Sequence, residues 1–149
     1  MATSVDGLRK AMQNAAADAL EPPAHSPLRR EAKAFWPAII ASRARDEWDA
    51  NALTVAGQLA ECQAAIQQES ESLRVEGNVI TDGRAVKVNP RFKAVDILHR
   101  REMALMRTLR MGGRVSGDQR DALGKRYAEQ KAREIFAKLR GEDGDELLA

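Results

Sequence analysis

The sequence predicts a mainly α-helical protein whose core is a helical hairpin with one short β-hairpin between its two helices. Apolar side chains recur at helical spacing along residues 49–76, 91–111 and 118–140, whereas β-branched side chains flank a tight-turn signal in residues 78–88. Alanine supplies much of the 44% apolar content, and aromatic residues make up only 4%. Because small side chains bury little apolar area, we expect a homo-oligomer in which association adds to a marginal core.

Residues 1–26 are expected to form an N-terminal helix and a linker. The helix is polar and alanine-rich over residues 5–20, and the prolines that follow it cannot continue a helix. A Ser-Pro pair then has the residue types of a helix start, so a second helix is predicted from there, with a break at Pro37. Residues 27–48 therefore form a short helical pair, a possible DNA-reading region.

Residues 49–111 are predicted to be the assembly core. The first long helix ends at Gly77, the β-hairpin turns at Asp82-Gly83, and an Asn-Pro pair opens the next helix. A lone two-stranded hairpin is marginal in water, so this one must pack on helices or pair with copies of itself. The first helix also carries apolar residues at seven-residue spacing. The candidate oligomerisation residues are Leu59, Ile66, Leu73, Val79, Ile80, Val86 and Val88.

The C-terminal part divides into a basic helix within residues 112–140 and an acidic tail, residues 141–149. From Arg84 to Arg140 there are 16 basic and 6 acidic residues, a net charge of +10, although the whole chain carries only +2. The tail has four acids and no base, and its composition predicts disorder. A basic body followed by an acidic tail is a charge pattern expected of a polyanion binder.

The sequence offers little support for catalysis, a metal or a cofactor. Its glycines lack the offsets of a phosphate-binding loop, and no metal-ligand pattern surrounds His25 or His99, of which His99 is interpreted as a packed or interface residue. Cys62 is the single cysteine and follows an acidic residue, which favours an inert thiol. The acids at 46–49 fit a helix start better than an ion site. No apolar run is long enough for a membrane span, and we expect a cytoplasmic protein.

The positive evidence for function is a set of regularly spaced cations. Lys93, Arg100 and Arg107 recur every seven residues and so share one face of a helix. Arginine suits phosphate because its planar fork binds two oxygens at once. The alternative is a solvated face whose cations pair with nearby acids. The candidate DNA-binding residues are Arg100, Arg101, Arg107, Arg110, Arg114, Arg120, Lys125 and Arg126. A second candidate set near the N-terminus is Arg29, Arg30, Lys33, Arg43 and Arg45.

The order of the elements resembles that of a known family. A Phe-Trp-Pro sequence at 35–37 precedes the helix entry Trp-Asp-Ala-Asn-Ala-Leu at 48–53. A long polar helix follows and ends in Glu-Gly-Asn-Val at 76–79, before the hairpin and Val-Asn-Pro at 88–90. Over residues 28–128 this order resembles the small terminase subunit of tailed phages, particularly those that package DNA with cohesive ends.

The resemblance implies a ring-forming, non-catalytic protein that binds double-stranded viral DNA at the packaging-initiation site. Its further partner would be the large terminase subunit, which carries the ATPase and nuclease, and its location the host cytoplasm. One departure is that no clear helix-turn-helix turn is visible near the N-terminus. The alternatives are another oligomeric DNA-binding regulator, such as a dimeric repressor, and a helical adaptor that does not bind DNA.

Overall fold

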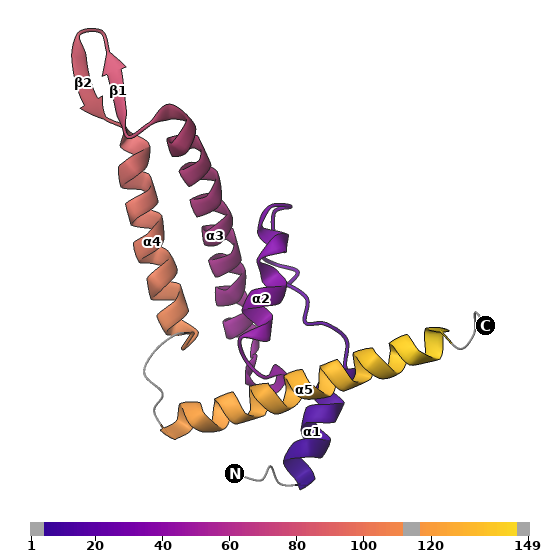
Figure 1. Cartoon of the computed structure of the whole chain (residues 1–149). Coiled ribbons are helices and arrows are strands. Elements are labelled where there is room, and N and C mark those ends of the chain that lie inside the picture. Colours follow the sequence, from indigo (N-terminus) through magenta and orange to yellow (C-terminus); the bar gives the residue numbers. More distant parts are fainter. Residues whose placement is uncertain (1–4, 112–116, 146–149) are drawn as a thin grey trace. The chain divides into compact units, whose positions relative to one another are not determined.

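The structure is a computed structural model that describes residues 5–111 and 117–145, except for the side chains at 82, 117–121 and 141–145 (Figure 1). The predicted fold class is confirmed in that the chain is mainly α-helical with one two-stranded antiparallel sheet. The chain divides into two compact units. Unit 1 comprises Met1–Glu21, Ile40–Asp49 and Arg114–Ala149, and unit 2 comprises Pro22–Ile39 and Ala50–Gly113.

Two long helices that lie side by side, α3 (Ala50–Glu76) and α4 (Pro90–Thr108), form most of unit 2 (Figure 1). Between them, the Cys62 thiol donates to the carbonyl of Leu98 at 3.4 Å, and the Gln63 amide donates to the Glu102 carboxylate at 3.1 Å. Helix α4 ends three residues before the predicted boundary, and the buried Leu109 follows as its C-cap.

The β-hairpin pairs β1 (Val79–Asp82) with β2 (Ala85–Val88). The predicted turn is wrong by one residue, because Asp82 pairs with Ala85 and the two-residue loop is Gly83-Arg84. Gly83 has φ +63° and no other residue of the loop has positive φ, which fits a turn with glycine at its first central position. The right-handed twist of the strands favours this turn type.

Asn89 joins the base of the hairpin to both long helices. Its side chain is 2% exposed, caps α4 by accepting from the Arg91 N–H at 3.0 Å, and donates to Glu76 and to the carbonyl of Gly77, both at 3.0 Å. The Arg91 guanidinium binds Glu76 at 3.0 Å and Glu69 at 2.7 Å. The start of α4 is therefore fixed to the end of α3 by hydrogen bonds and ion pairs.

Residues 22–39 pack on the N-terminal half of α3, and their secondary structure differs from the predicted one. Instead of an α-helix from Pro27, the structure has a short 3-10 helix, Ala32–Ala34, followed by α2 (Trp36–Ala41). Pro37 does not break a helix but occupies the first turn of α2, where the missing N–H costs nothing. Leu28 and Ala32 are buried, and Leu28 Cδ2 lies 3.6 Å from the position of a Cβ on Gly57 of α3.

Unit 1 packs α1 (Val5–Ala16) against α5 (Gly117–Asp145). The predicted N-terminal helix is four residues too long, and Asp18 and Glu21 follow its end, where negative charge is unfavourable. Conversely, α5 continues through residues 141–145, where composition predicted disorder, because helix propagation adds one hydrogen bond per residue at little cost. The rest of the predicted tail, 146–149, lies outside the described residues.

A buried carboxylate links the elements of unit 1. Glu129 on α5 is 3% exposed and accepts from the Asn14 amide at 3.4 Å, the Arg45 N–H at 2.9 Å and the Arg133 guanidinium at 2.5 Å. A buried charge is tolerated only when it is paired and hydrogen-bonded in this way. Among residues 5–111 and 117–145, no helix is both long and apolar enough to cross a membrane.

Candidate nucleic-acid interface

The outer face of α4 carries a stripe of exposed cations, Lys93, Arg100 and Arg107. The three residues lie seven apart, so their positions drift by only about 20° per step around the helix. Arg100 donates to Asp96 at 2.6 Å, with side-chain exposures of 77% and 51%. Within the described parts of the chain, Lys93 and Arg107 have no ion-pair partner.

The pairing of Arg100 does not remove it from the candidate site. An exposed ion pair four residues apart on a helix contributes only about 0.3–0.5 kcal/mol. A phosphate with two oxygens placed for a guanidinium can therefore replace Asp96 at small cost. The stripe therefore presents three exposed cations on one face of α4.

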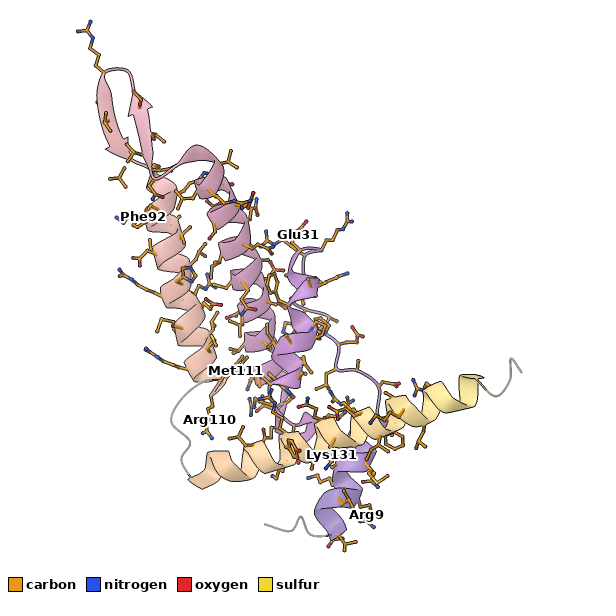
Figure 2. All side chains as sticks on the ribbon, viewed as in Figure 1. Arg9, Glu31, Phe92, Arg110, Met111 and Lys131 are labelled. Atoms are coloured by element: carbon orange, nitrogen blue, oxygen red, sulfur yellow. The ribbon has the colours of Figure 1, made fainter. Side chains whose placement is uncertain are left out.

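Arg101 and Arg110, which were also predicted to bind DNA, are both exposed. Burial raises the pKa of the Cys62 thiol, and the charge of Arg101 only partly offsets this, so the cysteine is a packed, unreactive thiol. Arg110 lies at the end of α4 beside Met111 (Figure 2). It has φ +54°, the left-handed conformation that glycine usually supplies, and the Met111 N–H closes the helix by donating to the carbonyl of Met106 at 2.8 Å.

The remaining predicted cations belong to unit 1. Lys125 on α5 is exposed, whereas Arg126 is half-buried. The Lys10 ammonium, 2.8 Å away, holds the pKa of Asp46 below its usual value, with a smaller contribution from Lys125. Arg114 and the side chain of Arg120 lie outside what the structure describes. The set predicted as one surface is thus divided between two units.

The alternative N-terminal set is largely engaged in contacts that hold the fold. Arg29 binds Glu61 at 2.5 Å, and Arg45 donates to the carbonyl of Asp18. Arg43 lies 5.0 Å from the ring centre of Trp48 and 3.7 Å from Glu47. In the described part of the chain, Arg30 and Lys33 remain exposed without an ion-pair partner.

Comparison with known proteins agrees with the predicted resemblance. Residues 2–149 match the model of the Hendrixvirinae small terminase family. The terminase small subunit of Enterobacteria phage HK97 is 30% identical over 142 residues, which cover 94% of this chain and 88% of that protein.

The chain belongs to the Hendrixvirinae small terminase family. The predicted resemblance to small terminase subunits is thereby confirmed, and it extends beyond the residues 28–128 on which it was based.

The residues predicted to mediate assembly occupy three different environments. Leu59 is fully buried within unit 2, so its side chain is used by the core of the chain itself. Ile66 and Leu73 are half-buried on the side of α3 that faces α4, and Ile80 is half-buried on the hairpin. The valines of the hairpin are exposed: Val79 by 55%, Val86 by 72% and Val88 by 69%.

The two histidines lie apart from any cluster of potential metal ligands among the described residues. Among the described residues, no group of three or more histidine, cysteine, aspartate or glutamate side chains is arranged to hold a metal ion. His99, predicted to be a packed or interface residue, has 53% of its side chain exposed, and its Nδ1 lies 3.3 Å from the Glu102 carboxylate. His25 lies 3.3 Å from the Thr54 hydroxyl.

Proposed function

We propose that this chain is the DNA-binding small subunit of a phage terminase, a non-catalytic homo-oligomer of the host cytoplasm. It recognises viral DNA for packaging and regulates a large ATPase/nuclease subunit. The observation that carries the DNA-binding part is the stripe Lys93, Arg100 and Arg107, whose cations are exposed on one side of a helix. The subunit relationship is supported by the family match, because the HK97 protein is named a terminase small subunit.

Self-assembly is supported by the exposed apolar residues of the β-hairpin, because Val79, Val86 and Val88 are 55–72% exposed. We propose that residues 49–111 form most of the contacts between subunits of the ring.

Salt-dependent binding to duplex DNA tests the proposed interface. Each phosphate contact changes log K against log[salt] by about −0.9. The double variant Arg100→Ala/Arg107→Ala should therefore flatten this slope by about two units per engaged protomer, with helicity and oligomer mass unchanged. The matched control is Arg30→Ala/Lys33→Ala, which also removes two exposed cations without ion-pair partners among the described residues.

The two variants separate the possible outcomes. A flattened slope in the control alone would move the DNA site to the N-terminal set. Absence of DNA binding by the parent protein would support a helical adaptor, and a dimer mass in light scattering would support a repressor-like regulator. Either result would overturn the proposed function.

A further inference from the structure

The cationic stripe of α4 contains an exposed acid. Helix α4 has two acids, and the side chain of one, Glu102, is only 20% exposed and accepts from Gln63 of α3 at 3.1 Å. The other, Asp96, has 51% of its side chain exposed. Since successive residues of a helix turn by about 100°, Asp96 lies about 40° from Arg100 and about 20° from Arg107 around the axis. A carboxylate therefore lies on the surface that is proposed to bind phosphate.

Asp96 is bonded to the middle cation of the stripe. The Arg100 guanidinium donates a hydrogen bond from Nη2 to Asp96 Oδ2 at 2.6 Å. The carboxylate oxygen thus takes the place that a phosphate oxygen would take. Lys93 and Arg107, the cations before and after, have no ion-pair partner in the part of the chain that the structure describes.

This ion pair is too weak to keep phosphate away from Arg100. An exposed pair of residues four apart on a helix changes an equilibrium constant by only about a factor of two. The carboxylate accepts from one guanidinium nitrogen, whereas a phosphate can accept two parallel hydrogen bonds from the same group. A phosphate placed next to Arg100 therefore displaces Asp96, but the exchange lowers the net gain from that contact.

The displaced carboxylate stays close to the DNA. Because Asp96 lies about 40° around the helix from Arg100, it remains on the bound side, where its charge repels phosphate. Competition and repulsion both act on the DNA backbone and not on base edges, so they lower the affinity for every duplex. Sequence-independent binding holds a protein at the many competing sites of a long DNA, and a residue that weakens it raises the specificity ratio.

We propose that Asp96 is a specificity-determining residue of the α4 stripe, because it competes with backbone phosphate for Arg100 and so limits sequence-independent binding to duplex DNA. Asp96 acts through Arg100 and forms no bond to the DNA itself. The inference rests on the proposed DNA-binding function and adds the residue that restrains the same surface.

A double-mutant cycle for Asp96 and Arg100 tests the competition. The probe is a random-sequence duplex of about 30 base pairs, roughly three helical turns, and the affinity is measured by fluorescence anisotropy. Asp96→Asn should tighten binding by more than about twofold per engaged protomer, because it frees Arg100 and removes a like charge. In an Arg100→Ala background the gain should be about twofold smaller, since no pair remains to be released. Asp96→Glu keeps a carboxylate four residues before Arg100 and should bind as the parent does.

The matched control is Glu71→Gln. It removes the carboxylate of another exposed ion pair, with Arg74 at 2.7 Å, which lies on α3 and not on the stripe. This variant should keep the parental affinity, and circular dichroism should show the parental helicity for every variant. Equal gains from Asp96→Asn with and without Arg100 would show repulsion alone and overturn the competition. An unchanged affinity for Asp96→Asn, or an equal gain for Glu71→Gln, would contradict any special role of Asp96.

Failure of this inference is distinguishable from failure of the proposed function. If Arg100→Ala/Arg107→Ala flattens the salt slope of the parent protein and Asp96→Asn leaves the affinity unchanged, only the role of Asp96 is excluded. If the parent protein does not bind duplex DNA even at low salt, the proposed function itself fails.

Discussion

The first and the last turn of α4 use arginine in opposite ways. Arg91, in the first turn, binds two carboxylates and lies beside the buried Asn89. Arg107, near the last turn, is exposed and has no ion-pair partner among the described residues. The first arginine contributes to the fold, and the second is available to a ligand. Spacing therefore identifies a basic face, whereas the acids of the neighbouring helix decide which cations remain available to a ligand.

The largest expected effect is on stability and comes from Asn89→Ala. The substitution removes the N-cap of α4 and leaves the Gly77 carbonyl without its amide donor, a loss of about 2–3 kcal/mol in the free energy of unfolding. Urea denaturation followed by circular dichroism measures it. A loss below about 0.5 kcal/mol would show that Asn89 does not hold the hairpin base.

The same substitution should also change the acid response of Glu76. Hydrogen bonds from Asn89, and then from Arg91, hold the pKa of Glu76 below its ordinary value. A lowered pKa contributes stability above the unfolded value, which is lost as the pH falls through the folded value. In Asn89→Ala, NMR titration should show the pKa of Glu76 rising toward its ordinary value, and the acid-side loss of stability should shrink. An unchanged pKa would assign the shift to Arg91 alone.

Arg91→Ala should destabilise unit 2 by less than half as much as Asn89→Ala, since its ion pairs are partly exposed. Arg74→Ala is the matched control, because Arg74 pairs with Glu71 on the surface of α3 with 77% of its side chain exposed. The control should leave the urea midpoint unchanged. Equal effects of the two substitutions would remove the distinction between the structural arginine and an ordinary surface one.

Arg110→Gly should separate stability from binding. Glycine relieves the left-handed backbone conformation at φ +54°, so unfolding should become more difficult by about 1 kcal/mol. If Arg110 contacts phosphate, the salt slope for duplex DNA should also flatten by about 0.9. A stabilised variant with the parental slope would place Arg110 outside the DNA site.

The sequence predicted those features of the fold that depend on local signals. The long helices, the hairpin and the Asn-Pro start of α4 follow from helical periodicity, turn chemistry and capping, and each is found within a few residues of its predicted position. The segment before α2 was predicted wrongly because a Ser-Pro pair signals a helix start locally, whereas Leu28 and Ala32 are held by packing on α3. That packing joins residues distant in sequence, and local propensity does not depend on such contacts.

The sequence could predict the stripe of cations in the candidate site, but not which cations are paired with acids. Seven-residue spacing identified Arg100 and Arg107, but nothing local shows that Arg29 is paired with Glu61 across 32 residues. The role of Glu129 was missed for the same reason, since its donors Asn14 and Arg45 come from distant parts of the chain. Tertiary pairing of charges decides these roles.

The central claim is that the exposed cations of the α4 stripe bind DNA, whereas Arg91, which pairs with Glu69 and Glu76, holds the fold. The most direct test compares the salt dependence of duplex DNA binding for Arg107→Ala and Arg91→Ala, at a temperature where both are folded. Arg107→Ala should flatten the slope of log K against log[salt] by about 0.9 per engaged protomer, and Arg91→Ala should keep the parental slope. A parental slope for Arg107→Ala together with a flattened slope for Arg91→Ala would contradict the account.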